Sequence, residues 1–136
     1  MGQVPDLPIA KPPKLRLPVP SRSKRIPALI AIKLLHTAIW LFFAGCIVAL
    51  PFAGAGNHFW LAAILSGIVL IECAVIVFNR GRCPLTDLAA RYTPDRRDNF
   101  DIYLPVWLAR HNKTIFGTIF VLGGLFTLVR WLLSTR

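Results

Sequence analysis

Glu72 and His36 are the two side chains whose chemistry stands out in a mostly apolar sequence. Glu72 interrupts the apolar block at residues 60–79, WLAAILSGIVLIECAVIVFN. A carboxyl group inside a membrane-spanning helix is costly unless it is protonated, paired or open to water. At a helical rise of ~1.5 Å per residue, Glu72 should lie ~12 Å below the polar end of this block. We expect His36 at the same depth, with Lys33 or Thr118 nearby.

Such a buried cluster has two interpretations. It could relay protons or bind a polar cofactor group, because histidine and carboxylate groups titrate readily when they are buried together. Alternatively, the same hydrogen bonds only set the register of the helices in apolar surroundings. We favour the structural interpretation, because no other residues complete a catalytic set. We therefore predict that the protein is not an enzyme, and proton or redox chemistry at Glu72, His36 and Cys83 is the alternative.

The cysteines are too few and too scattered for a disulfide framework, and no CxxC pair indicates zinc binding. Cys46 and Cys73 lie in apolar blocks and are expected to be inert packing residues. Cys83 follows Arg80 and Arg82, whose positive charges favour its thiolate. A reactive or acylated Cys83 is therefore the alternative to an inert one.

We expect no metal ion and no cofactor. His36 and His111 are predicted in the same half of the membrane, so a haem with two histidine ligands, or a bound pigment, is the less favoured alternative. His58 is predicted at the opposite boundary and is too far from His111 to share a metal ion with it. The candidate cofactor-binding residues are therefore His36, Glu72 and His111.

Three apolar stretches are long enough to cross a bilayer and must position these side chains. The expected spans are residues 28–52, 60–79 and 114–133, in a chain of 136 residues that is 55% hydrophobic. About 20 apolar residues cover the hydrocarbon core. The sequence therefore predicts an all-α membrane protein with an arm at residues 1–27 and a transmembrane domain at residues 28–136. Within this domain, residues 80–113 connect the second span to the third.

The basic residues lie between the apolar blocks rather than in one binding surface. Six Lys and Arg residues lie in 1–27 and seven in 80–113, whereas 51–59 has none. The positive-inside rule places the N-terminus and the 80–113 connection in the cytoplasm, and the C-terminus on the far side of the membrane. The net charge of +10 is thus explained by topology, and no nucleic-acid binding is expected.

Two segments outside the spans have their own patterns. Residues 4–27 contain seven prolines among basic residues, so we expect an extended, non-helical arm that contacts anionic lipid headgroups. In the connection, Thr86 is expected to cap a short cytoplasmic helix that ends near Arg91, with Asp87 in its first turn. Residues 100–108 are apolar but too short to span, and are expected to lie along the membrane interface.

His36, Glu72, Cys83-Pro84-Leu85-Thr86 and Tyr103-Leu104-Pro105 occur in an order that resembles a bacterial family. This is an uncharacterised family of small integral membrane proteins with a CPLT segment, a domain of unknown function. The resemblance covers residues 34–132 and implies no assigned reaction. It implies a bacterial inner membrane, in which the C-terminus would lie in the periplasm. Where that family usually has Glu-His-Tyr, this chain has Asp101-Ile102-Tyr103.

Small residues on the predicted helices allow close approach of another helix. Examples are Gly45, Ala62 and Gly117. We therefore expect a non-catalytic accessory subunit of a larger membrane complex, respiratory or photosynthetic by analogy, that docks through its transmembrane helices and its N-terminal arm. Its partners would be the lipid bilayer and other membrane-protein subunits. A transporter is disfavoured, because three spans without an inverted repeat enclose no pathway.

Overall fold

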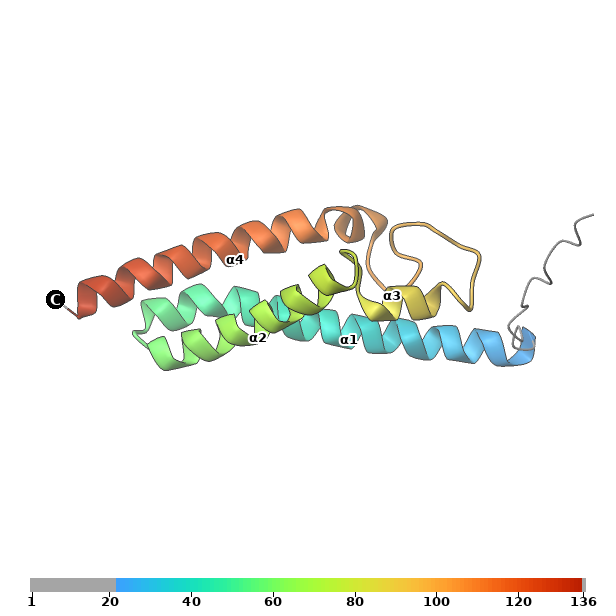
Figure 1. Ribbon diagram of the computed structural model, residues 1–136, viewed down its shortest axis with the longest axis horizontal. Coiled ribbons are helices and arrows are strands. Elements are labelled where there is room, and N and C mark those ends of the chain that lie inside the picture. The colour runs from blue at the N-terminus through green and yellow to red at the C-terminus, as the bar shows by residue number, and fades with distance from the viewer. Residues whose placement is uncertain (1–21, 136) are drawn as a thin grey trace, which may run out of the picture.

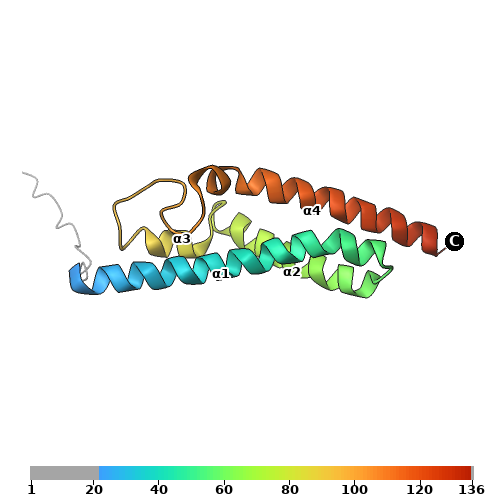
Figure 2. The ribbon, with the colours of Figure 1, turned by 180° about the vertical axis from the view of Figure 1, so that it is seen from behind.

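A computed structural model describes residues 22–135, and the predicted arm up to residue 21 lies outside the described residues. Three long helices run alongside one another, and one short helix lies in the connection between the second and third of them (Figure 1). The long helices are α1 (Arg22–Ala55), α2 (Phe59–Phe78) and α4 (Val106–Ser134), and the short one is α3 (Pro84–Ala89). The same arrangement is visible from behind (Figure 2).

Helix α1 begins within the segment that was expected to be extended. Residues 22–27 are helical, and the helix continues through both Pro27 and Pro51. A proline removes one backbone hydrogen bond and crowds the preceding turn, but neighbouring groups in membrane helices can compensate for this loss. The prediction that proline excludes a helix throughout 4–27 was therefore wrong for its last six residues, 22–27.

Helix α2 matches the predicted second span to within one residue at each end. It follows α1 after a tight turn in which Asn57 has a left-handed φ of 58°. Helix α4 contacts this turn through Arg130, whose guanidinium donates hydrogen bonds to the Ala55 carbonyl and to the Asn57 side chain, at 3.2 and 3.0 Å. Arg130 therefore satisfies a carbonyl at the end of α1, which would otherwise lack a donor.

Helix α4 begins at Val106, whereas the third span was expected from residue 114. The expected interfacial segment 100–108 is consequently divided: its first residues pack against α1, and its last three form the first turn of α4. Pro105 explains the division, because it precedes the helix as its N-cap rather than interrupting it.

Helix α1 is the centre of the molecule, with α2 and α4 packed mainly against it rather than against each other. Leu50 on α1 is only 1% exposed and is the largest fully buried side chain of the described part. Gly54 of α1 lies against Thr127, and Gly123 of α4 lies against Pro51. The other buried side chains between these helices include Cys46, Ile47, Ala53, Ala62 and Val69.

All three long helices are long and apolar enough to cross a membrane, over Arg25–Ala55, Phe59–Phe78 and Val106–Ser134. Their outward surfaces carry many exposed large apolar side chains, such as Phe52, Ile71 and Leu133. Exposed apolar surface of this extent requires lipid or another apolar partner. The chain is thus an all-α membrane protein, and the predicted fold class is confirmed.

Candidate functional site

The 80–113 connection folds back onto the N-terminal half of α1. The backbone amide of Tyr103 donates a hydrogen bond to the Thr37 hydroxyl at 3.0 Å, and this hydroxyl donates to the Lys33 carbonyl at 2.7 Å. The Lys33 ammonium group lies 5.1 Å from the centre of the Tyr103 ring. Ile102 and Leu104, on either side of Tyr103, are buried. One turn of α1 therefore holds the middle of the connection in place.

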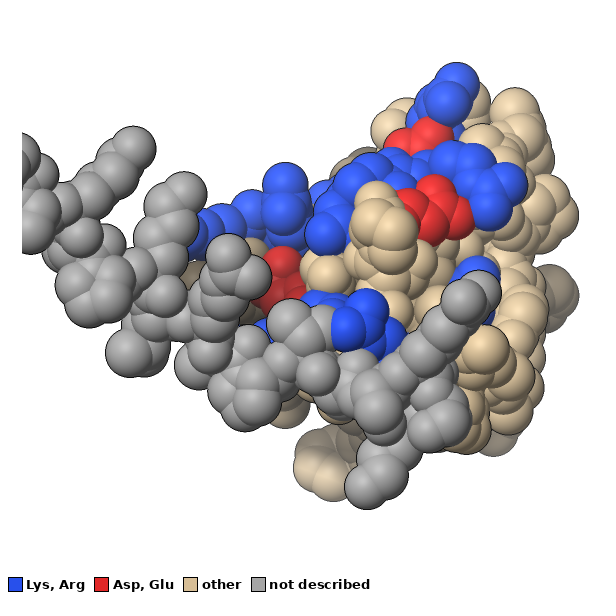
Figure 3. Space-filling view, turned by 90° about the vertical axis from the view of Figure 1, so that its right-hand side faces the viewer, with Lys and Arg blue, Asp and Glu red and all other residues tan. Residues whose placement is uncertain are grey.

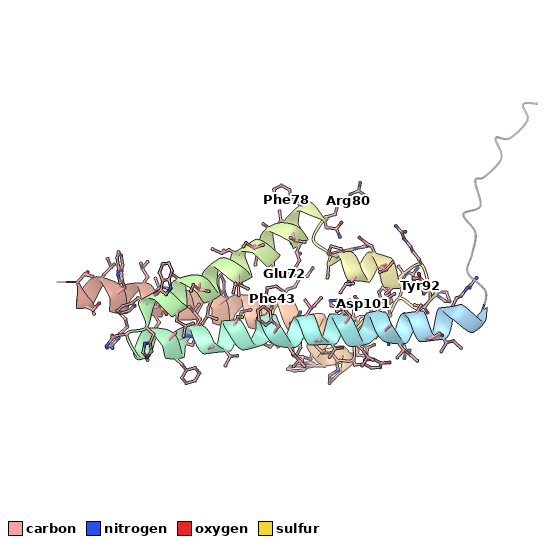
Figure 4. The ribbon with its side chains drawn as sticks, turned by 90° about the horizontal axis from the view of Figure 1, so that it is seen from below. Phe43, Glu72, Phe78, Arg80, Tyr92 and Asp101 are labelled. Atoms are coloured by element: carbon pink, nitrogen blue, oxygen red, sulfur yellow. The ribbon has the colours of Figure 1, made fainter. Side chains whose placement is uncertain are left out.

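Asp101 is the buried acid at the centre of this contact, with 5% of its surface exposed. Its carboxylate oxygen Oδ2 lies 3.2 Å from the His36 Nδ1 atom, and the Asp101 backbone carbonyl lies at the same distance from that nitrogen. The Thr86 hydroxyl donates a hydrogen bond of 2.5 Å to Oδ2. Residues of α1, α3 and the connection therefore meet at one carboxylate, and Figure 4 shows Asp101 beside α1.

The Asp101 carboxyl is held in its ionised form. Burial alone would raise its pKa, but hydrogen bonds from His36 and Thr86 outweigh burial and lower the pKa below the ordinary 3.8. Both oxygens that face His36 Nδ1 are acceptors, so this nitrogen must carry a hydrogen. In the neutral imidazole, the lone pair therefore lies on Nε2.

Cys83 brings a thiol to the same imidazole ring. It is the N-cap of α3, is partly buried, and interacts with the His36 side chain. Helix α3 is fixed against the rest of the fold, because Ala89 near its end is completely buried. Three chemically distinct groups, the thiol of Cys83, the imidazole of His36 and the carboxylate of Asp101, are thus gathered at one place. We call them the thiol cluster.

Thr86 does not cap α3, contrary to expectation. The helix begins at Pro84, so Thr86 lies inside it and Cys83 takes the N-cap position. The Thr86 hydroxyl instead donates to Asp101. Proline is favoured in the first helical position because it has no backbone N–H to leave unpaired there. The CPLT segment therefore supplies Thr86 as a donor to the buried Asp101, and Cys83 as a thiol near His36.

Glu72 does not meet His36, so the predicted cluster of these two residues does not form. Figure 4 shows Glu72 beside Phe43, separated from Asp101 along the bundle. The reason is the register of α1 and α2, in which Cys46 packs with Val69. Stepping ten residues along each helix from this pair reaches His36 (46 − 10) on α1 and Asn79 (69 + 10) on α2. His36 therefore lies at the end of α2, not at the depth of Glu72.

Within residues 22–135, Glu72 makes no hydrogen bond or ion pair. The partners that were expected for it are elsewhere: Lys33 lies over the Tyr103 ring, and Thr118 lines a shallow hollow on α4 with Gly117 and Val121. The depth estimate failed because α1 extends well beyond the level at which α2 ends.

The two histidines considered as haem ligands have separate surroundings. His111 is exposed on α4, with its Nδ1 atom 2.9 Å from the Trp107 carbonyl and its ring 5.6 Å from the Trp107 ring. His36 Nδ1 is occupied by Asp101. His58 is exposed at the start of α2, at the other end of the helices. In the part of the chain that the structure describes, no group of three His, Cys, Asp or Glu side chains is arranged to hold a metal ion.

Asp101 is the residue that sequence reasoning missed. A lone acid in the apolar stretch from Phe100 to Leu108 is a usable signal, because fully buried acids almost always have partners. The sequence does not indicate which residue is the partner of Asp101, because His36 is 65 residues away in the chain.

Comparisons with protein-family models, with curated proteins and with solved structures found no match. The resemblance to the CPLT family therefore stays a prediction.

Proposed function

We propose that this protein is a non-catalytic accessory subunit of a larger membrane complex, and that it docks through its transmembrane helices. The observation that carries the proposal is Glu72, a carboxyl group in a spanning helix without a hydrogen bond or ion pair in residues 22–135. Such a group needs a partner in a membrane. The proposed partner is a transmembrane helix that presents a basic or hydrogen-bonding side chain to Glu72.

The surface between α2 and α4 supports this proposal. These two helices have few contacts with each other. The shallow hollow between them is lined mostly by small residues, which are Ala62, Ala63, Ser66, Gly124 and Thr127. Phe59, Leu128 and Trp131 also line it. Small residues let a further helix approach closely enough for van der Waals contact along the backbone.

The distribution of charge supports an orientation with the connection in the cytoplasm. Figure 3 looks onto the end that carries the connection and shows Lys and Arg side chains gathered there, with few acidic ones among them. Some of these charges are internally paired, since Asp95 binds Arg97 at 2.7 Å and Asp98 binds Arg110 at 2.8 Å. The excess of basic over acidic side chains at this end suits an anionic lipid surface. We propose a bacterial inner membrane, with the N-terminus cytoplasmic and the C-terminus periplasmic.

Energy-transducing assemblies, respiratory or photosynthetic, are the proposed hosts. This part of the proposal is an analogy: such complexes contain small helical subunits, and no residue of this chain identifies one of them.

The test is native purification of the full chain in mild detergent, followed by native gel electrophoresis. We expect migration with a complex of fixed stoichiometry, loss of this association in Glu72→Leu, and retention in Glu72→Gln, which keeps hydrogen-bonding capacity. Cys73→Ala, one position along α2 at an exposed residue, is the matched control and should behave as the wild type. A wild-type chain that migrates alone would contradict the proposal.

A small redox or proton-handling protein is the second candidate. The electrostatic interaction of Cys83 with His36 favours it, but the register of α1 and α2 keeps Glu72 at a different depth from His36. If Glu72→Gln retains assembly and leaves function in the native membrane unchanged, Glu72 is not a proton relay.

A further inference from the structure

The end of α2 carries basic residues that neither the accessory-subunit proposal nor the thiol cluster uses. The turn after α2 contains Arg80, Gly81 and Arg82, and both arginines are exposed. The Lys113 ammonium group of α4 reaches this turn and donates a hydrogen bond to the Gly81 carbonyl at 2.5 Å. Two segments that are far apart in the sequence therefore bring three basic residues to one turn.

The positive charge of this turn is not neutralised within residues 22–135. Lys113 has only an uncharged carbonyl as its partner, and neither arginine makes an ion pair. One acid lies at the turn, the Asp87 carboxylate, which accepts a hydrogen bond from the Asn79 side chain at 3.0 Å. Three basic residues and one acidic residue leave a net positive charge, which complements an anionic ligand.

A shallow hollow of about 370 Å³ on α4 begins at Lys113. We call it the α4 hollow, and it is lined by Lys113, Thr114, Gly117, Thr118, Val121 and Leu122. Gly117 keeps it open, because a Cβ atom added there would meet nothing within 4 Å. Phe116, Ile119 and Phe120 of α4 pack instead against the buried cluster of α1 and α2. The α4 hollow therefore faces outward, toward the lipid.

The α4 hollow changes from polar to apolar along its length. The Thr114 hydroxyl, beside Lys113, makes no hydrogen bond within the described residues and is free to donate to a ligand. At the other end, Val121 and Leu122 are 65% and 61% exposed. The nine residues from Lys113 to Leu122 (122 − 113) rise ~14 Å along the helix, and one leaflet of the hydrocarbon core is ~15 Å thick. The hollow therefore has the length of one acyl chain in one leaflet.

The polar end of the α4 hollow lies at the level of the lipid headgroups. Lys113 contacts the turn that follows α2, and the last side chains of α2, Val77 and Phe78, are apolar and 72% and 89% exposed. Figure 4 shows Phe78 and Arg80 at this end of α2. Exposed apolar side chains lie in the hydrocarbon, and basic side chains beyond them reach the headgroups. The change from one to the other occurs at the depth of Lys113.

We propose that one anionic phospholipid binds in the α4 hollow. Its phosphate accepts hydrogen bonds from the Lys113 ammonium group, which has three donors and gives one to Gly81, and from the Thr114 hydroxyl. The two arginines of the turn add positive charge. One acyl chain lies along Gly117 toward Leu122. A zwitterionic phospholipid carries no net charge to match this turn, so the site selects a lipid such as phosphatidylglycerol over phosphatidylcholine.

The test is native mass spectrometry of the full-length wild-type protein in mild detergent. Dioleoyl-phosphatidylglycerol and dioleoyl-phosphatidylcholine are titrated separately, and because their acyl chains are the same, a difference in affinity reports the headgroup. Each Lys or Arg at the site should strengthen anionic lipid binding about fivefold. We expect the first phosphatidylglycerol to bind about tenfold or more tightly than the first phosphatidylcholine. Equal affinities would overturn the proposal, and this comparison requires no variant.

A charge variant then locates the headgroup. Lys113→Gln should weaken binding of the first phosphatidylglycerol about fivefold and leave phosphatidylcholine unchanged. Arg91→Gln is the matched control, because it removes the same charge from an exposed residue just beyond α3 and should keep the wild-type affinity. Equal losses in the two variants would show that net charge alone attracts the lipid, and would overturn the site.

A glycine variant locates the acyl chain. Gly117→Leu fills the α4 hollow without meeting another part of the fold and should remove the tight first binding event. Gly67→Leu is the same change on α2, also with nothing within 4 Å of the added Cβ, and should bind lipid as the wild type does. Both variants should keep the wild-type helix content by circular dichroism. Tight lipid binding in Gly117→Leu, or a wild-type dimer that this variant loses, would show that no lipid occupies the hollow.

The isolated chain is used throughout, so the result does not depend on a partner complex. Failure of the lipid test leaves the accessory-subunit proposal standing, because that proposal is tested by native electrophoresis of the Glu72 variants.

Discussion

Replacing Asp101 by alanine should release the connection from α1. The Asp101 carboxylate accepts hydrogen bonds from the Thr86 hydroxyl and from His36 Nδ1 while only 5% exposed. Hydrogen bonds to a charged group contribute about 1.5–3 kcal/mol each. Loss of both hydrogen bonds should cost about 3 kcal/mol or slightly more. The cost stays at the low end of the summed range because His36 Nδ1 keeps the backbone carbonyl of Asp101 as an acceptor. This cost falls on the local opening of the connection rather than on the transmembrane helices.

Hydrogen exchange with mass spectrometry in nanodiscs measures this opening. The amides to follow are those of Phe100, Ile102 and Tyr103, which donate to Arg97 O, Asn99 O and Thr37 Oγ1. Since about 1.4 kcal/mol corresponds to a factor of ten, exchange of these amides should accelerate about 100-fold in Asp101→Ala. Amides in the middle of α2 should be unaffected.

Asp98→Ala is the matched control for this experiment. It removes the same charge from the same connection, but the Asp98 side chain is 42% exposed and its partner Arg110 is 64% exposed. An exposed ion pair contributes little to stability because water screens it. Exchange in Asp98→Ala should therefore stay close to the wild type. Equal acceleration in the two variants would refute the view that Asp101 holds the connection in place.

Three further predictions concern pH and helix packing. The pKa of Asp101 is lowered in the fold, so its stabilising contribution is present above pH 3.8 and is lost as the pH falls toward the folded-state pKa. At that low pH, the difference in hydrogen exchange between wild type and Asp101→Asn should disappear. Gly54→Ala would place a Cβ atom 3.1 Å from the Cα of Thr127 and should destabilise the fold by about 1–3 kcal/mol, measured by unfolding in mixed micelles. Gly45→Ala, with nothing within 4 Å, should be neutral or stabilising by up to about 1 kcal/mol, and equal midpoints of the two variants would contradict this packing. The Trp40 indole donates a hydrogen bond to the Asn112 side chain at 2.7 Å. A double-mutant cycle of Trp40→Phe and Asn112→Leu should therefore give about 1 kcal/mol of coupling energy. Zero coupling would show that this bond does not stabilise the α1–α4 contact.

The fold class followed from the sequence because membrane crossing is a local property. A stretch such as residues 60–79 spans the bilayer by its own length and polarity, whatever its neighbours are, and α2 lies within one residue of that range at each end. Helix ends were predicted less well. Pro27 lies inside α1 and Pro105 directly precedes α4, and the type of residue alone does not distinguish these two contexts.

The site was decided by tertiary structure. The sequence indicated His36, Glu72 and Cys83 as separate candidates, from their types and from the apolar or basic residues around them. Which of them meet depends on how far α1 extends past α2 and on where the connection folds back, and both are set by contacts between residues far apart in the chain. His36 and Asp101, 65 residues apart, meet because α1 and the connection pack together, and the same register leaves Glu72 at another depth. Local composition determines which segments enter the membrane, whereas packing between segments determines which polar groups become partners.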